Sequence, residues 1–159
     1  MGHTTLLFLI KKSAGKISHI CLAMKKRRFG TGKWNGVGGK LEGAETLEEG
    51  LLREVEEEIT VIPKNFKKIA MIDFIYSHKP EWDQVAHVYF CEEWEGDPRE
   101  TEEMKPEWFS VNALPFESMW PDDPLWLPRA VSGENLKCRF VLTEGDKLLE
   151  HKVEVVEAF

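Results

Sequence analysis

The sequence predicts an α+β fold in which a mixed β-sheet lies between helices. Strand-like segments come in pairs near both ends of the chain, and two helical segments interrupt them without a regular strand–helix–strand repeat. With 159 residues, 42% of them apolar, the chain is long enough to bury a substantial core. We therefore expect one domain spanning residues 1–159.

The first half of the chain predicts a hairpin, a loop and a helix in that order. Residues 4–11 and 17–24 are dominated by β-branched and apolar side chains and flank a turn-prone segment, which is typical of paired strands. Six glycines within residues 30–43 predict a loop whose backbone can approach a ligand closely. A capping-box pattern then begins at Thr46, and the apolar stripe of an amphipathic helix follows it at Leu47, Leu51, Val55 and Ile59.

The second half predicts further strands and a second helix. Residues 68–76 and 84–91 have strand-like patterns, and an acidic, turn-rich stretch separates them from a short strand that begins at Trp108. Asp123 precedes a proline, which is the signature of an N-cap and a first helical turn. The last two strand-like runs, residues 136–143 and 148–156, predict a closing hairpin.

The overall charge and the cysteines limit the possible partners. A formal net charge of -7 and a pI near 5.3 repel polyanions, which argues against a module that binds DNA or RNA. Cys21, Cys91 and Cys138 are widely spaced and odd in number, so we expect reduced core residues. The apolar run at residues 6–10 is too short to span a membrane. We expect a monomer in the cytoplasm that acts on a small molecule.

Three glutamates on the first helix form the main candidate site. Glu54, Glu57 and Glu58 stand at positions i, i+3 and i+4 beside the apolar stripe, and we expect no cation of the helix to neutralise them. Their mutual repulsion requires a partner, and carboxylate oxygens suit a hard divalent cation such as Mg²⁺. The alternative is an acidic face that is merely solvated.

The flanking residues favour the metal site, because the segment resembles the Nudix box. Gly39, five residues, Glu45, seven residues and then Arg53-Glu54-Val55-Glu56-Glu57-Glu58 match its spacing, and the one departure is Thr60 where the family has glycine. The resemblance implies an α/β/α sandwich. It also implies Mg²⁺, or Mn²⁺ as a substitute, held by Glu54, Glu57, Glu58 and the carbonyl of Gly38. In such proteins Arg53 and Glu45 would orient the helix and its loop.

The chemistry implied by this resemblance is attack of an activated water on a bridging phosphate, which releases a nucleoside monophosphate and pyrophosphate. Segments outside the box, among them Trp34-Asn35-Gly36 and Met119-Trp120-Pro121-Asp122-Asp123, resemble the animal MutT-type branch of the family, which hydrolyses oxidised purine nucleoside triphosphates. This similarity is good over residues 20–130 and holds only in outline at the terminal hairpins.

The same resemblance implies roles for individual side chains around the base. Asn35 would pair with one base edge, Asp122 and Asp123 would read the other, and Trp120 would stack on the purine. The remaining residues would line the pocket or contact phosphates and metal: Phe29, Met104, Lys25 and Glu103. Each also has a plainer interpretation, such as an N-cap for Asp123, a core residue for Trp120 and a turn residue for Asn35.

Two neighbouring aspartates in one apolar pocket should not both ionise, because burial and like charge each raise a carboxyl pKa. A protonated carboxyl donates a hydrogen bond, so we expect the base preference to change with pH.

Two other functions remain open. The first is a Nudix hydrolase for ADP-ribose, dinucleoside polyphosphates or undamaged triphosphates, since the family's specificity lies outside the box. The second is a catalytically silent nucleotide-binding module, which the intact set of three glutamates disfavours. The basic run at residues 25–28 is either solvated or a wall facing phosphates.

Overall fold

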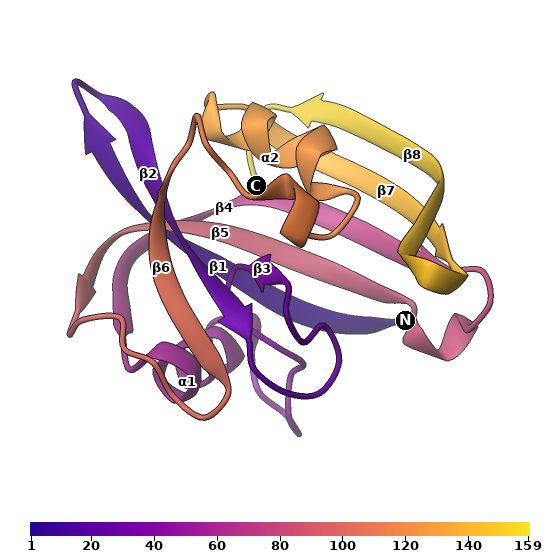
Figure 1. Ribbon diagram of the computed structural model, residues 1–159, viewed down its shortest axis with the longest axis horizontal. Helices are drawn as coiled ribbons and strands as arrows, with labels where there is room; N and C mark the ends of the chain where they lie inside the picture. Colours follow the sequence, from indigo (N-terminus) through magenta and orange to yellow (C-terminus); the bar gives the residue numbers. More distant parts are fainter.

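A computed structural model describes all residues, 1–159, and contains a mixed eight-stranded sheet. The strands are β1 (Gly2–Ser13), β2 (Lys16–Lys25), β3 (Trp34–Asn35), β4 (Ile62–Tyr76), β5 (Gln84–Glu95), β6 (Met104–Ser110), β7 (Asn135–Thr143) and β8 (Lys147–Val156). They run in the order β3-β2-β1-β5-β4-β7-β8, with β6 paired to β2 (Figure 1). The β1/β5 and β4/β7 pairs are parallel and the others antiparallel, which confirms the predicted mixed sheet.

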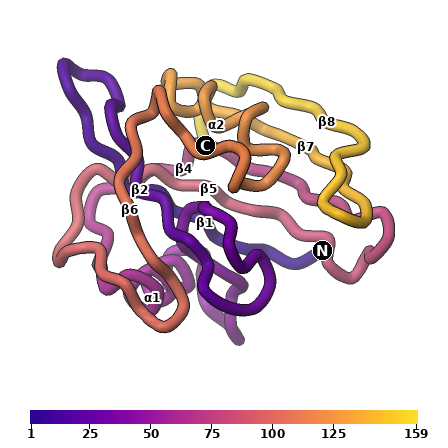
Figure 2. Tube along the Cα trace, in the orientation of Figure 1, coloured from indigo at the N-terminus to yellow at the C-terminus, as the bar shows by residue number.

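Two helices cover opposite faces of this sheet. Helix α1 (Leu47–Ile59) lies on one face and α2 (Asp123–Val131) on the other, and three single 3-10 turns, η1 (Pro80–Trp82), η2 (Phe116–Ser118) and η3 (Glu144–Asp146), lie in the connections. The β1–β2 hairpin projects beyond the rest of the sheet (Figure 2). The expected α/β/α arrangement is therefore confirmed.

Strand β1 shows why both faces need a helix. Leu7 and Leu9 enter the hydrophobic cluster under α1, whereas Phe8 and Ile10 enter the cluster that also holds Trp126 of α2. Successive side chains of a strand point to opposite faces, so a strand that is apolar at every position must be covered on both sides. The run of five apolar residues at the N-terminus is thus a central strand.

Helix α1 begins as the sequence predicts, with a complete capping box. The hydroxyl of Thr46 accepts the backbone N–H of Glu49, and the Glu49 carboxylate accepts the N–H of Thr46. The helix ends at Thr60, which has the left-handed conformation (φ 61°) that the family pattern gives to glycine. This conformation costs a residue with a side chain about 1–2 kcal/mol. The Thr60 hydroxyl donates to the carbonyl of Asp97 (3.1 Å), which offsets part of that cost.

Three strand boundaries differ from the sequence-based prediction. Strand β4 begins at Ile62, β5 continues to Glu95 and β6 begins at Met104, so much of the stretch predicted to be turns is paired sheet. Most of the added residues are polar or proline, which weakens the local strand pattern. They are held in the sheet by distant partners, for example Pro63 by Trp94 and Pro106 by Ala23.

The cysteines and the lengths of the helices complete the description of the fold. Cys21, Cys91 and Cys138 are buried and unpaired, as predicted. None of the helices combines the length and the apolar character that crossing a membrane requires.

Candidate metal and nucleotide site

The glycine loop that precedes α1 is fastened to the start of β1. The backbone N–H of Thr5 donates to the carbonyl of Gly39 (3.0 Å), and Leu7 and Val37 exchange two further bonds of 2.7 and 2.9 Å. Gly38 has φ 154°, and a Cβ there would collide with the carbonyl oxygen of Thr5. Only glycine fits this approach, so the loop's position relative to β1 is fixed by its sequence.

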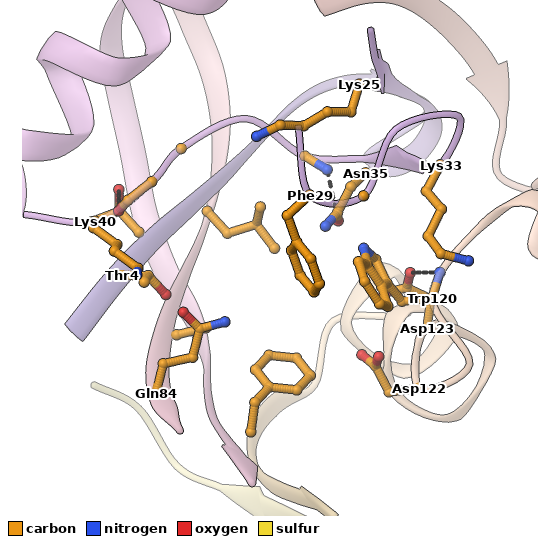
Figure 3. A pocket seen from close by; sticks show the side chains of 18 of the residues that line it. Thr4, Lys25, Phe29, Lys33, Asn35, Lys40, Gln84, Trp120, Asp122 and Asp123 are labelled. Carbon is orange, nitrogen blue, oxygen red and sulfur yellow. Dashed lines mark hydrogen bonds between the residues drawn. The ribbon is translucent and has the colours of Figure 1, made fainter. Parts of the chain in front are cut away.

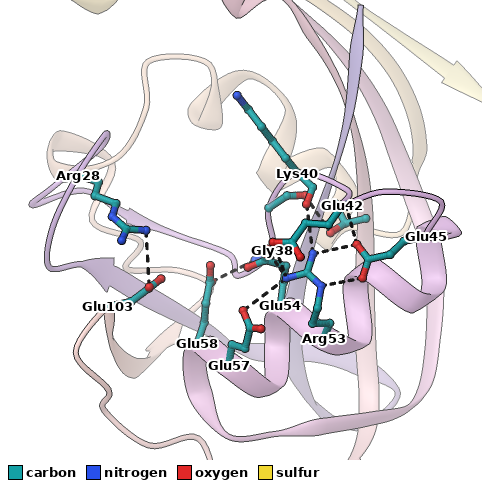
Figure 4. A network of polar contacts seen from close by, with 12 residues as sticks. Arg28, Gly38, Lys40, Glu42, Glu45, Arg53, Glu54, Glu57, Glu58 and Glu103 are labelled. Atoms are coloured by element: carbon teal, nitrogen blue, oxygen red, sulfur yellow. Dashed lines mark hydrogen bonds and ion pairs between the residues drawn. The ribbon is translucent and has the colours of Figure 1, made fainter.

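Two of the predicted metal ligands face this loop from α1. The Glu58 side chain is buried and its carboxylate accepts the N–H of Gly38 (3.2 Å), while the Glu54 carboxylate lies so close to Gly39 that a Cβ there would be 2.8 Å from it (Figure 4). Burial and then the charge of Glu54 raise the pKa of Glu58 to about 8. Glu57 lies on the exposed side of the same helix.

Arg53 lies among these acids, which corrects the expectation that no cation of the helix neutralises them. Its guanidinium donates to both oxygens of Glu45 (2.6 and 2.9 Å), to Glu54 (3.0 Å) and to Glu57 (3.4 Å). These hydrogen bonds hold the pKa of Glu45 at about 2. The bidentate pair ties the glycine loop to the helix, which is the geometry expected if Arg53 and Glu45 orient the site.

The ligand atoms offered by α1 and the glycine loop suit a hard divalent cation. The groups are oxygen only: three carboxylates and the backbone carbonyl of Gly38. No three acidic, histidine or cysteine side chains converge closely enough to form a closed cage. A bound cation would therefore complete its coordination with water or substrate phosphates, and the crowding of Glu54 and Glu58 gives it a reason to bind.

Glu103, predicted to approach the metal from a separate loop, is engaged by the basic run. Its carboxylate pairs with Arg27 (3.2 Å) and Arg28 (3.8 Å), and Lys26 pairs with Glu100 (2.6 Å). Of the four basic residues, only Lys25 lines the neighbouring pocket. The run therefore faces an acidic loop for most of its length.

A pocket of about 220 Å³ opens next to this acidic cluster. It is lined by the start of β1, the β2–β3 loop, the ends of β4 and β5 and the segment that leads into α2 (Figure 3). The residues predicted for the substrate meet here, beside the predicted metal ligand Gly38: Lys25, Phe29, Asn35, Met104, Trp120, Asp122 and Asp123. Residues from five separate parts of the chain thus form one site.

Asp122 and Asp123 are both buried and both line the pocket. The carboxylate of Asp122 accepts the indole N–H of Trp126 (2.9 Å), and that of Asp123 accepts the backbone N–H of Trp120 (3.1 Å). Burial raises the pKa of Asp122 to about 6, and burial together with the charge of Asp122 raises the pKa of Asp123 further above its usual value. The prediction of Asp123 as N-cap was wrong: the helix begins at Asp123, and Asp122 occupies the cap position without a capping bond.

These buried acids predict a definite change of stability with pH. A carboxyl whose pKa rises on folding stabilises the protein fully below its unfolded pKa of 3.8, and this contribution is lost as the pH rises through the folded value, about 6 for Asp122. Asp122→Asn cannot ionise, so we expect its melting temperature relative to wild type to be more favourable at pH 7 than at pH 4. Thermal unfolding at both pH values measures this, with the exposed Asp97→Asn as control. An equal offset at both pH values would contradict the effect.

The aromatic and amide groups form the upper part of the pocket. Trp120 lies against Phe29, with ring centroids 5.2 Å apart and planes inclined by 31°, and the Nζ of Lys33 lies 5.0 Å from the Trp120 ring. The side-chain oxygen Oδ1 of Asn35 accepts the backbone N–H of Gly36 (2.8 Å), which fixes the orientation of the side-chain amide. A flat ring with polar edges matches this combination of groups.

Sequence reasoning did not identify several lining residues. Tyr76 and Gln84 line the pocket from the ends of β4 and β5, and Lys33 does so from the loop before β3. Their positions at strand ends and in a loop indicated only in general terms that they could bind a ligand, because such segments carry most binding residues. Which strand ends meet depends on sheet order, which no local pattern reveals.

The fold and the site define a class: a sandwich in which a glycine loop and a glutamate helix lie beside a pocket for a flat ring. A family model described as the NUDIX domain matches residues 3–130, and the chain belongs to this family. The oxidized purine nucleoside triphosphate hydrolase of Danio rerio is 39% identical over 138 residues, 87% of this chain and 88% of the relative. That of Mus musculus is 36% identical over 140 residues, or 88% and 89%.

The fold is also that of a solved structure. The mutator MutT protein of Bacillus halodurans superimposes with a TM-score of 0.79 over 97% of this chain and 98% of that one, at 21% identity. The sandwich inferred from the sequence is therefore the architecture of a known MutT protein.

Proposed function

We propose that this protein hydrolyses oxidised purine nucleoside triphosphates, such as 8-oxo-dGTP and 2-hydroxy-dATP, to the monophosphate and pyrophosphate. The observation that carries the proposal is that one pocket is lined both by the two buried aspartates and by the glycine loop that faces the acidic helix. A purine in the pocket would extend its phosphates toward Glu54 and Glu58. The names of the zebrafish and mouse relatives support the same substrate class.

On the phosphate side, Glu54, Glu57, Glu58 and the carbonyl of Gly38 would hold Mg²⁺, with Mn²⁺ as a substitute. When bound, the ion supplies charge neutralisation at the phosphates and acidifies the attacking water. Arg53 keeps the carboxylates in place through its bonds to Glu54 and Glu57. Glu103 would act as a further ligand or proton acceptor after leaving Arg27, and Lys25 would contact the phosphates.

On the base side, Trp120 would stack on the purine and the polar groups would read its edges. A protonated Asp123 offers a donor, whereas an ionised Asp122 offers only acceptors, so the pair can match an edge that both donates and accepts. Asn35 would pair with the opposite edge, and Phe29 and Met104 would enclose the ring. An oxidised base differs from the normal one in such donors and acceptors, which is why this pair would discriminate.

The setting that we propose is the nucleotide pool of the cytoplasm, where a monomer would remove damaged precursors before a polymerase uses them. Three buried free thiols support a reducing compartment. The net charge of -7 supports a small-molecule substrate in preference to a nucleic-acid polymer.

Steady-state kinetics with Mg²⁺ test the proposal. We expect kcat/KM for 8-oxo-dGTP to exceed that for dGTP by about 10- to 100-fold, since one or two hydrogen bonds to buried groups are worth roughly 1–3 kcal/mol. The products should be the monophosphate and pyrophosphate. Equal hydrolysis of both triphosphates, or faster turnover of ADP-ribose or a dinucleoside polyphosphate, would contradict the proposed preference for oxidised purine triphosphates. Binding without any hydrolysis would indicate a silent module.

A further inference from the structure

Phe29 lines the base pocket from the loop between β2 and β3, where its ring is largely exposed. The side chain is 54% exposed, and left-handed backbone at Arg28 (φ 69°) and Gly30 (φ 85°) flanks it. Its ring contacts two indoles from different connections, Trp120 at 5.2 Å and Trp82 at 5.3 Å between centroids. Phe29 therefore contacts both Trp120, which lines the pocket, and Trp82, which does not.

Trp82 is itself held in place by contacts with neighbouring residues of its own connection. It ends the η1 turn between β4 and β5, and Tyr76, His78 and Lys79 surround its ring at 5.7, 5.8 and 4.4 Å. The following Asp83 closes the turn by accepting the backbone N–H of Tyr76 (2.7 Å). Trp82 is thus 38% exposed but anchored on several sides.

The same turn is joined to the pocket wall. Tyr76 and Gln84, the residues at which β4 ends and β5 begins, both line the cavity. Trp82 lies between them in sequence, does not line the cavity itself and contacts two residues that do, Phe29 and Tyr76. Tyr76 is buried within β4, whereas Phe29 is exposed on a loop, so the influence of Trp82 on a bound base would pass mainly through Phe29.

We propose that Trp82 is a positioning residue that holds Phe29 over the purine and so contributes to nucleotide affinity and base selectivity. This inference rests on the proposed function. Without Trp82, the Phe29 ring loses one of its two aromatic contacts and keeps the one with Trp120, which is also the surface on which the base is to stack. The ring would then adopt several orientations, and ordering it would become part of the cost of binding.

The size and the kind of effect follow from this arrangement. One aromatic pair predicts a change in affinity of about 2- to 10-fold. The turnover rate should change less than 2-fold, because neither the glutamates of α1 nor Glu103 forms a hydrogen bond or ion pair with the η1 turn. A merely structural role of Trp82 would instead lower the melting temperature and the active fraction without this split between KM and kcat.

Titration calorimetry with the product 8-oxo-dGMP tests the inference without turnover, in Trp82→Ala, Trp82→Phe, Phe29→Ala and the double alanine variant. We expect Trp82→Ala to weaken binding about 2- to 10-fold and Trp82→Phe to restore most of it. Because Trp82 acts through Phe29, the double variant should bind no more weakly than Phe29→Ala alone. Kinetics should show the change in KM and an unchanged kcat. Phe159→Ala, which removes an exposed ring far from the pocket, is the matched control.

The outcomes separate this inference from the proposed function. If wild type binds 8-oxo-dGMP no better than dGMP, the proposed function fails, and the inference fails with it. If wild type prefers 8-oxo-dGMP and Trp82→Ala binds it equally well, only the role of Trp82 is overturned. Additive losses in the double variant, or a fall in kcat equal to the rise in KM, would also overturn it.

Discussion

Glu58→Gln is expected to lower kcat by about 100-fold or more and to leave the metal-free protein at least as stable as wild type. A metal ion supplies several kcal/mol of transition-state stabilisation, and each 1.36 kcal/mol lost is tenfold in rate. Glutamine keeps an oxygen that can accept the N–H of Gly38 and replaces a carboxyl whose ionisation is opposed by burial and by Glu54. The substitution should therefore lower kcat without lowering the melting temperature of the metal-free protein.

Two measurements check this prediction. Turnover of 8-oxo-dGTP at saturating Mg²⁺ gives the loss of activity, and thermal unfolding with EDTA gives the stability of the metal-free form. Glu56→Gln is the matched control, because Glu56 is exposed on the other side of the same helix. In wild type, Mg²⁺ should raise the melting temperature, and in Glu58→Gln this increase should shrink. A fully active Glu58→Gln, or activity that persists after removal of divalent ions, would rule out the metal role.

The acidic helix shows how much a local pattern can predict. Spacing alone gave α1 its bounds, its capping box and the side of the helix on which Glu54 and Glu58 lie, because all of these depend on residues close in sequence. The same projection missed Arg53 as a partner of the acids. A long side chain reaches beyond its own angular position, so its guanidinium contacts Glu54 and also Glu45 in the loop.

The pocket shows where local patterns stop. Asn35 and the two aspartates could be proposed only through resemblance, because their meeting depends on a sheet order that places β2, β1 and β5 side by side. Trp82 was not identified by either route. It lies in a turn outside the Nudix box, and its importance follows only from a contact with Phe29, 53 residues earlier in the chain. Long-range contacts of this kind leave no periodic signal.

Asp123→Ala is expected to reduce kcat/KM for 8-oxo-dGTP by about 100-fold, the second large effect that the site predicts. A buried polar group that pairs with a substrate edge discriminates strongly, because its loss leaves the substrate's own donors or acceptors unpaired in an apolar pocket. Alanine also frees the backbone N–H of Trp120 from its acceptor (3.1 Å), which would loosen the stacking residue. Steady-state kinetics with 8-oxo-dGTP and dGTP should show that the ratio between them falls toward one.

Asp123→Asn distinguishes a protonated from an ionised aspartate. Burial and the neighbouring Asp122 raise the pKa of Asp123, which favours the protonated carboxyl, a group that donates as well as accepts. An amide does the same at every pH. The asparagine variant should therefore retain activity within about 10-fold of wild type, since one neutral hydrogen bond is worth about 1 kcal/mol. Its preference between 8-oxo-dGTP and 2-hydroxy-dATP should no longer change between pH 6 and pH 9. If the asparagine and alanine variants are equally impaired, an ionised carboxylate reads the base, and the account of the buried pair fails.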